Sequence, residues 1–367
     1  MPQLKKVAIA CGGTGGHLYP GISIAEELKA QEIEVRLYVS NKPIDQKVLS
    51  EFPYFHAVVV PVMGWPGLGP KVISFFLKLM SGYLQALREL KKFQPDVVLG
   101  MGGFTCAPLL LVARQKGIAT FLHESNAIPG KVTRQLASWV KKVFIGFENC
   151  RQHLEKNGRT ECVLTGTPVR SSLKKMTKLE AAQKWELDLN SFTVAVMGGS
   201  QGARGLNRLV CRAATTINTD RPLQWLHLAG PDAEEVRAAY AETGVKAVVA
   251  DYCHEMEAVY GMADVIISRA GAASLNEIAY FGIPSVLVPY PHAAEYHQDA
   301  NAKIFSEAGA AKIVYEGDLD QASTILADEL TELLDESRRA EMSQQAKSLS
   351  KEDSVQAIVK ELTDVVC

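Results

Sequence analysis

Short apolar runs alternate with amphipathic stretches along the whole chain, and this alternation predicts the fold class. The runs are rich in Val, Ile and Leu, which is typical of parallel strands that are covered on both faces. In the first half, strands are predicted at residues 6–10, 35–39, 57–61, 97–99, 120–123 and 142–145. A second series follows at residues 192–197, 224–229, 246–250, 265–268 and 285–289, with residues 313–315 as a sixth candidate. The two series predict an α/β protein with two Rossmann-like, doubly wound domains.

The chain length agrees with two such domains. A domain usually holds about 100–200 residues, and the chain has 367. We place the first domain at residues 1–168 and the second at residues 169–349. The last amphipathic stretch, about residues 350–367, can pack on the second domain or return to the first.

Each predicted domain opens with a strand, a glycine-rich loop and a helix. The loops are residues 12–17 and 198–203, and the first helix is expected at residues 20–31. Such a loop lets the backbone approach a phosphate, while the helix N-terminus supplies N–H donors. Neither loop matches the dinucleotide or P-loop spacing, since Leu18 stands where the third glycine of G-x-G-x-x-G is required.

Two side chains near glycine-rich segments are candidates for chemistry. His17 ends the first loop, and a helix N-terminus disfavours the imidazolium form, which suits a base that accepts a hydroxyl proton. Glu277 lies about one turn inside the helix that follows residues 268–274, where its carboxylate can accept hydrogen bonds from a ribose. The alternatives are a structural histidine and a glutamate that only complements the helix N-terminus.

Charge and cysteine usage add two constraints. Residues 1–170 carry 21 Lys and Arg against 12 Asp and Glu, a net charge of +9, and the remainder carries 18 against 29, or −11. A basic first half predicts an anionic partner for that half. The seven cysteines are scattered without a Cys-x-x-Cys pair, which favours reduced cytosolic thiols over a disulfide framework or a zinc site. We expect no signal peptide, no membrane-spanning helix and no essential metal.

Residues 65–92 suggest contact with a membrane surface. A helix is predicted from residue 71 onward, with one apolar stripe for the core and a second formed by Ile73, Leu77, Met80 and Leu84. The second stripe can lie on a membrane interface beside basic residues; the alternative is a helix buried on both sides. The membrane-contacting residues are predicted to be Trp65, Leu68, Lys71, Phe75 and Lys78.

At its glycine loops and the motifs between them, the chain resembles the MurG family of peptidoglycan synthesis. These enzymes transfer N-acetylglucosamine from UDP-N-acetylglucosamine to an undecaprenyl-diphosphate-linked muramyl-pentapeptide. Several motifs occur in the family's order, at residues 12–17, 100–104, 123–126, 198–203, 269–279 and 297–302. Phe104, Thr167 and His297 depart from the residues that the family often carries there.

The resemblance implies two Rossmann-like domains facing across a cleft, which is the GT-B fold, and an inverting transfer without a cofactor. His17 is then the catalytic base, with Glu124 as the next candidate. The implied acceptor-binding residues are Gly13, Gly103, Phe104 and Asn126. The implied donor-binding residues are Thr14, Gly15, Gly16, Asn126, Arg170, Ser200, Cys253, Ala272, Ala273, Ser274, Leu275, Asn276, Glu277 and Gln298.

The expected partners are therefore the nucleotide sugar, the lipid-linked acceptor and an anionic membrane surface, with peripheral attachment at the cytoplasmic face and no nucleic acid. Two alternatives remain open at this stage. One is another UDP-sugar enzyme of the same architecture, such as an epimerase or a transferase with a soluble acceptor. The other is a non-catalytic, membrane-associated protein that binds nucleotide sugars.

Overall fold

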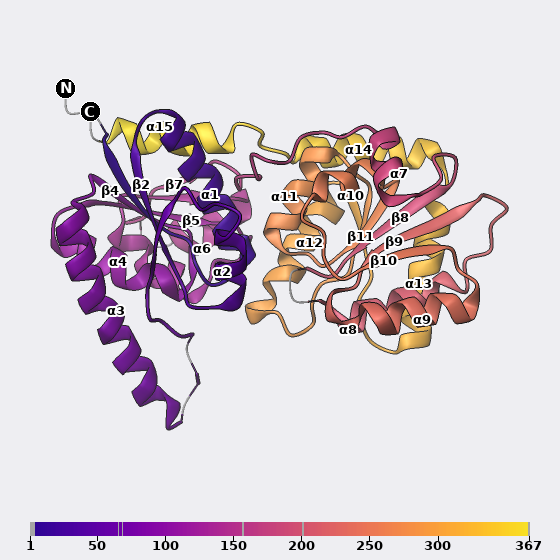
Figure 1. The fold of residues 1–367 in the computed structure, drawn as a ribbon, viewed down its shortest axis with the longest axis horizontal. Coiled ribbons are helices and arrows are strands. Elements are labelled where there is room, and N and C mark those ends of the chain that lie inside the picture. Colours follow the sequence, from indigo (N-terminus) through magenta and orange to yellow (C-terminus); the bar gives the residue numbers. More distant parts are fainter. Residues whose placement is uncertain (1–3, 65, 68, 156–157, 200–201, 366–367) are drawn as a thin grey trace. The chain divides into compact units, whose positions relative to one another are not determined.

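The computed structural model describes residues 4–64, 66–67, 69–155, 158–199 and 202–365 (Figure 1). It divides into two compact units. Unit 1 comprises Met1–Ser171 and Lys351–Cys367, and unit 2 comprises Ser172–Ser350. The division falls three residues after the one expected at 168/169, and the C-terminal segment belongs to unit 1.

Unit 1 is built on a parallel seven-stranded sheet with the order β3-β2-β1-β4-β5-β6-β7. Six of its strands were predicted, and β7, which is only three residues long, was not. The strands are β1 (Lys6–Ala10), β2 (Glu34–Val39), β3 (His56–Val59), β4 (Val97–Gly100), β5 (Ala119–Glu124), β6 (Lys142–Ile145) and β7 (Cys162–Leu164). The helices are α1 (Gly15–Ala30), α2 (Pro43–Leu49), α3 (Lys71–Phe93), α4 (Gly103–Gln115), α5 (Lys131–Leu136), α6 (Arg151–Leu154) and α15 (Ser354–Asp364).

The apolar runs are continuous because both faces of this sheet are buried. In β1, Val7 and Ile9 belong to one hydrophobic cluster, while Ala8 and Ala10 belong to another. Side chains of a strand alternate between its faces, so a strand covered on both sides needs apolar residues at every position. Residues of α1 and α15 complete the first cluster, and residues of α3, α4 and α5 complete the second.

Helix α1 begins five residues earlier than predicted. The expected helix began at Pro20, and the first turn of a helix is where proline is well tolerated. The glycine loop itself supplies the first turn instead, and Pro20 stands inside the helix. The helix nevertheless continues to Ala30, since its other residues keep helical hydrogen bonding and Leu18, Ile22 and Ile24 are buried in the core.

Unit 2 has a parallel six-stranded sheet with the order β10-β9-β8-β11-β12-β13. All six strands were predicted, although β13 lies two residues before its expected place. The strands are β8 (Phe192–Met197), β9 (Leu223–Leu228), β10 (Ala247–Ala250), β11 (Val265–Ser268), β12 (Ser285–Leu287) and β13 (Ala311–Ile313). The helices are α7 (Lys178–Trp185), α8 (Arg204–Ala214), α9 (Ala233–Thr243), α10 (Met256–Met262), α11 (Ala272–Phe281), α12 (His297–Glu307), α13 (Leu319–Glu332) and α14 (Glu336–Ser348).

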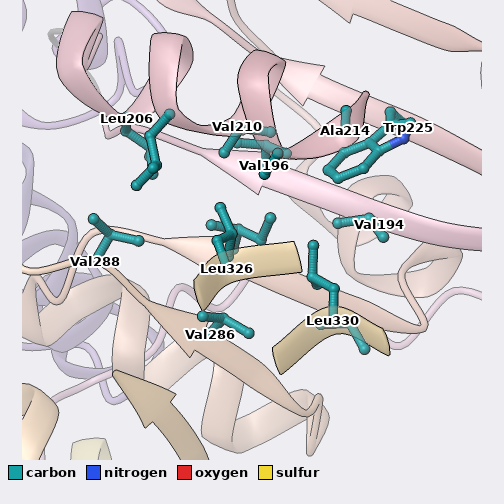
Figure 2. Packing of buried hydrophobic residues seen from close by; sticks show 14 of the residues in the cluster. Val194, Val196, Leu206, Val210, Ala214, Trp225, Val286, Val288, Leu326 and Leu330 are labelled. Atoms are coloured by element: carbon teal, nitrogen blue, oxygen red, sulfur yellow. The ribbon is translucent and has the colours of Figure 1, made fainter. Parts of the chain in front are cut away.

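The core of unit 2 lies between this sheet and two of its helices. Figure 2 shows side chains of β8 packed beside Leu206 and Val210 of α8, with Leu326 and Leu330 of α13 nearby. Each of these four leucine and valine side chains is at most 2% exposed. Fully burying such a side chain contributes about 1.5–3 kcal/mol, so this layer anchors α8 and the glycine loop before it.

The strand order reverses at one point in each sheet, between β1 and β4 in unit 1 and between β8 and β11 in unit 2. Loops that leave the carboxyl ends of such neighbouring strands diverge, and ligands of doubly wound sheets bind there. Each unit therefore presents its own candidate half-site at its switch point. It is built by residues 11–17 and 101–104 in unit 1 and by residues 198–199, 202–203 and 269–277 in unit 2.

Candidate active site

In unit 1, the loop after β1 leads directly into α1. Thr14 is extended, with φ −154° and ψ 157°, and its carbonyl oxygen accepts hydrogen bonds from the backbone N–H groups of His17 and Leu18, both at 3.1 Å. His17 therefore stands in the first turn of α1, with its Nδ1 atom 3.3 Å from the Thr14 hydroxyl oxygen. Gly15 and Gly16 share this turn, and an α-helix provides no intrahelical acceptor for N–H groups at these first two positions.

The imidazole of His17 lies against Gly102 and Gly103, which follow β4. A Cβ atom on Gly102 would come within 3.1 Å of His17 Nε2, and one on Gly103 within 3.2 Å of Cε1. Both glycines also have positive φ, +97° and +71°, a backbone conformation that residues with a side chain rarely adopt. The switch point thus brings the predicted base beside the predicted acceptor residue Gly103. The next residue, Phe104, packs edge to face on Phe75, with 5.9 Å between ring centroids.

Asp45, at the start of α2, is a site residue that the sequence analysis missed. Its Oδ2 atom accepts hydrogen bonds from the Gly13 N–H (2.8 Å), the Ser40 N–H (2.9 Å) and the Ser40 hydroxyl (2.5 Å). The carboxylate is fully buried, and Oδ1 has no hydrogen-bond partner among the described residues. Gly13 therefore donates its N–H to the protein itself, which fixes the shape of the loop and withdraws this donor from any phosphate. No motif in the sequence indicates Asp45, because it lies six residues beyond the end of β2 and meets Gly13 only in the folded chain.

His123, at the end of β5, is fully buried and structural. Its Nε2 atom donates to the Gly166 carbonyl oxygen at 3.0 Å, and its Nδ1 accepts from the Ser125 hydroxyl at 3.4 Å. Burial lowers the pKa of His123 to about 4, despite the opposing effect of the Gly166 carbonyl. The ring is therefore neutral, and it joins the strand end to the segment that follows β7.

Glu124, the second candidate for the base, already accepts three hydrogen bonds. Oε1 accepts from the backbone N–H (3.1 Å) and side-chain amide (3.0 Å) of Asn126, and Oε2 accepts from the Gly130 N–H (3.0 Å). The carboxylate is also buried, at 4% exposed. This arrangement suits a residue that orients Asn126 better than one that takes a proton from a substrate.

Arg170 lies in unit 1 and not in the second domain, where the expected boundary placed it. Its guanidinium carbon stands 4.4 Å from the ring centroid of Tyr19 on α1. The side chain is partly exposed, so the cation lies close to the glycine loop with the aromatic face behind it.

In unit 2, the start of α11 has the features of an anion site. Gly271 caps the helix in an extended conformation, and the first turn of this helix, which the structure describes throughout, contains no acidic residue. Ala273 and Ser274 are partly exposed, whereas Leu275 is fully buried and can offer a ligand only its backbone. Asn276 is engaged as well, since its amide donates to the Ala272 carbonyl oxygen at 2.8 Å. The free N–H groups of the first turn and the helix dipole favour a negatively charged ligand there.

Glu277 lies further along the same helix. Its carboxylate is 7% exposed, and Oε2 accepts a hydrogen bond from the Tyr260 hydroxyl at 2.6 Å. Gln298, near the start of α12, accepts the Tyr290 N–H with its Oε1 at 2.9 Å. The remaining polar group of the Gln298 amide is its NH₂, so this side chain can act as a hydrogen-bond donor to a sugar oxygen.

Arg269 holds the segment between β11 and α11 in place. Its Nη1 donates to the Val288 carbonyl oxygen at 3.1 Å, and its Nη2 lies 2.6 Å from Glu316 Oε1. The Arg269 side chain is only 8% exposed, so both contacts are structural. The hydrogen bond links the carboxyl end of β11 to that of β12, and the ion pair links it to the segment that follows β13. In the sequence, Arg269 belongs to one of the family motifs, but nothing there indicates that its side chain has this structural role.

Two predicted donor residues remain. Ser200 lies outside the described residues. The glycines around it are constrained, because a Cβ on Gly202, which has a φ of +75°, would come within 2.7 Å of Pro231 Cδ. Cys253, between β10 and α10, is buried, and its thiol donates to the Glu255 carbonyl oxygen at 3.3 Å.

Helix α3 exposes the apolar stripe that was predicted for a membrane surface. Ile73, Leu77, Met80 and Leu84 are 70%, 67%, 58% and 49% exposed, so the alternative of a helix buried on both sides is wrong. Lys71 and Lys78 are exposed as well. Figure 1 shows α3 extending beyond the sheet of unit 1.

The prediction for Phe75 is wrong. It was predicted to contact the membrane, but it is 8% exposed, because it turns inward onto Phe104. Its neighbour Phe76 is exposed instead, at 56%. Trp65 and Leu68 lie outside the described residues.

Within the described residues, no helix is both long and apolar enough to span a bilayer. No group of three or more His, Cys, Asp or Glu side chains in the same residues could hold a metal ion.

Comparisons with known proteins show that both units match the domains of one glycosyltransferase family. Residues 7–145 match the family model described as the glycosyltransferase family 28 N-terminal domain, and residues 193–360 match the model for the family 28 C-terminal domain. A Geobacter sulfurreducens protein is 37% identical over 363 residues, which cover 97% of this chain and 98% of that protein. It is named UDP-N-acetylglucosamine--N-acetylmuramyl-(pentapeptide) pyrophosphoryl-undecaprenol N-acetylglucosamine transferase.

Solved structures agree with this assignment. The crystal structure of MurG from Acinetobacter baumannii is 27% identical, with a TM-score of 0.77, and the match covers 98% of this chain and 99% of that one. A UDP-GlcNAc 2-epimerase from Neisseria meningitidis, 17% identical with a TM-score of 0.69 over 98% of this chain and 100% of that one, shares the fold alone. With two Rossmann-like units, matches to both family 28 domains and a relative aligned over nearly its whole length, the chain has the GT-B fold and belongs to the MurG family of glycosyltransferases.

Proposed function

We propose that this chain transfers N-acetylglucosamine from UDP-N-acetylglucosamine to the N-acetylmuramyl-pentapeptide carried on undecaprenyl diphosphate. The observation that carries the proposal is the 37% identity to a transferase of that name over 97% of this chain. The reaction is a glycosyl transfer that needs a nucleotide-sugar site and a base. The two half-sites contain residues suited to both.

Unit 2 supplies the donor half of the chemistry. The N–H groups at the start of α11 bind the diphosphate of the nucleotide sugar, and Glu277 accepts hydrogen bonds from its ribose hydroxyls. The Gln298 amide donates to an oxygen of the sugar. As the bond between the anomeric carbon and the diphosphate oxygen breaks, negative charge grows on the leaving UDP. Fixed N–H donors aimed at that charge stabilise the transition state.

Unit 1 supplies the acceptor half. His17 removes the proton from the acceptor hydroxyl, whose oxygen then attacks the anomeric carbon while UDP leaves from the opposite face. One such displacement inverts the anomeric configuration, from α-linked donor to β-linked product. The contacts of His17 with Thr14, Gly102 and Gly103 restrict the ring to one place, which is what a general base requires.

The acceptor's lipid tail implies work at a membrane surface, and we place the enzyme peripherally at the cytoplasmic face. The exposed stripe of α3, namely Ile73, Leu77, Met80 and Leu84, supports this placement, together with Lys71 and Lys78. Apolar side chains can enter the interface while lysines meet anionic head groups.

The decisive experiment incubates the purified chain with UDP-N-acetylglucosamine and the lipid-linked muramyl-pentapeptide. UDP should be released only when the acceptor is present, and the lipid product should gain one N-acetylhexosamine by mass spectrometry. Epimerisation of the nucleotide sugar without acceptor, or binding without turnover, would contradict the proposal. UDP release with soluble acceptors alone would contradict the acceptor assignment.

A further inference from the structure

The carboxylate of Glu277 is held by a tyrosine from a neighbouring helix. Tyr260 lies on α10 and Glu277 on α11, and the phenolic hydroxyl donates to Oε2 at 2.6 Å. The two residues are 3% and 7% exposed. The Tyr260 ring is itself fixed, since it stacks on Phe281 with 4.8 Å between centroids and 24° between planes.

This hydrogen bond is of the strong kind. An O–H to carboxylate bond of about 2.5–2.7 Å is charge-assisted and roughly twice as strong as a neutral one. A glutamate side chain has several rotatable bonds, and a strong donor at its end selects among its rotamers. A carboxylate offers about four lone-pair positions, and the phenol occupies one of them, so this bond is compatible with a ligand's hydroxyl groups donating to the same carboxylate.

We propose that Tyr260 is a positioning residue that holds Glu277 in the rotamer that binds the donor's ribose. It thereby sets the preference of the site for a ribonucleotide over a nucleotide without ribose hydroxyls. The inference rests on the ribose role of Glu277 in the proposed function.

Tyr260 also packs in the interior, so the test must separate positioning from packing. Tyr260→Phe keeps the ring and its stack on Phe281 and removes only the hydroxyl. Tyr240→Phe is the matched control. Tyr240 is also a buried tyrosine of unit 2, 3% exposed, and its hydroxyl lies 3.0 Å from His227 Nδ1. Both changes delete one buried hydroxyl, and only the first deletes a partner of Glu277.

The measurement is calorimetric binding of UDP and of 2′,3′-dideoxy-UDP to the full chain and to each variant. The wild type should prefer UDP about tenfold or more, since hydrogen bonds to a charged acceptor are the strong ones. Tyr260→Phe should weaken UDP binding about fivefold to tenfold and leave dideoxy-UDP binding nearly unchanged. Tyr240→Phe should leave the ratio of the two affinities as in the wild type, whatever it does to thermal stability.

Two further readouts bear on the same point. In a Glu277→Ala background, Tyr260→Phe should have no additional effect on the ratio, because the two residues act as one unit. In the transferase assay, Tyr260→Phe should raise KM for the nucleotide sugar with kcat little changed, since the ribose contact is made equally in the ground state and the transition state.

Equal weakening of UDP and dideoxy-UDP by Tyr260→Phe, or no weakening of either, would overturn the role of Tyr260 alone. Two results would overturn the ribose assignment and, with it, this inference. One is a wild type that binds UDP and dideoxy-UDP equally well, and the other is a Glu277→Ala variant that keeps the wild-type preference for UDP. The transferase reaction is scored separately by acceptor-dependent UDP release, so its failure is distinguishable from both.

Discussion

The position of His17 is fixed by contacts with both segments that meet at the switch point of unit 1. Its ring rests on Gly102 and Gly103 and lies beside the Thr14 hydroxyl. A positioned general base typically contributes about 10²–10⁴-fold to the rate, so His17→Ala should lower kcat by that order and largely keep UDP affinity. The control is His56→Ala, which removes an exposed histidine on β3. Retention of more than about a tenth of wild-type kcat would move the role to another residue.

A second histidine makes the stability of unit 1 depend on pH. Burial lowers the pKa of His123 to about 4 in the folded state, against about 6.5 in an unfolded chain. Its contribution to stability is therefore complete above pH 6.5 and is lost as the pH falls from 6.5 toward 4, because the unfolded state then binds the extra proton.

Urea unfolding at pH 7 and pH 5 measures this effect. Between these values the wild type should lose about 2 kcal/mol through His123. His123→Gln can still donate to the Gly166 carbonyl, and it should remove that part of the pH dependence. His227 in unit 2, whose pKa burial lowers to about 3, provides a background in both proteins. An unchanged pH dependence in the variant would show that His123 is not the group that titrates.

Among the larger elements, the first glycine loop depends on a carboxylate outside it. Asp45→Ala would leave the N–H groups of Gly13 and Ser40 without their acceptor. The cost is about 1–3 kcal/mol for the buried Ser40 donor and less for the partly buried Gly13 donor. The expected result is a lower unfolding temperature together with reduced kcat, because the loop leads into His17. Asp328→Ala, at an exposed position of α13, should change neither. If Asp45→Ala were stable and fully active, the loop would hold its shape without this residue.

Helix α3 predicts how the enzyme attaches to lipid. The double variant Leu77→Ser, Met80→Ser should weaken binding to anionic vesicles by about tenfold or more for each side chain removed, given about 1.5–3 kcal/mol per buried side chain. Leu189→Ser, at a leucine of unit 2 that is 41% exposed, is the matched control. Salt should also release the wild type, since the screening length falls to about 3 Å at 1 M. Sedimentation with vesicles measures both effects, and a wild type that fails to bind would exclude this surface.

For the whole molecule, the chain's return to unit 1 makes the C-terminal helix part of that unit's core. Leu362 of α15 is fully buried in the cluster that contains Leu18 and Ile22, and Glu361 pairs with Lys142 at 2.8 Å. Leu362→Ala should therefore destabilise unit 1 by about 2–5 kcal/mol. Calorimetry should show an earlier transition for unit 1 and an unchanged one for unit 2, and the exposed Lys360→Ala should leave both in place. A shift confined to unit 2 would contradict the docking.

The apolar runs alone determined the α/β class and twelve of the thirteen strands in the described part of the chain, because a strand covered on both faces must be apolar throughout. The exception, β7, is too short for a run to stand out, and it pairs with β6 at one edge of the sheet. The order of motifs along the chain also identified the family and the glycine loops.

Tertiary structure alone decided which distant residues meet. Three contacts at the candidate sites each join different elements. They are the contact of His17 with Gly102 and Gly103, the hydrogen bond from Gly13 to Asp45, and the hydrogen bond from Tyr260 to Glu277. The inward turn of Phe75 and the docking of α15 are of the same kind. Local patterns report how a segment is buried, but strand order and helix packing set the partners of each side chain. Those partners fix the positions of the candidate catalytic and ribose-binding groups.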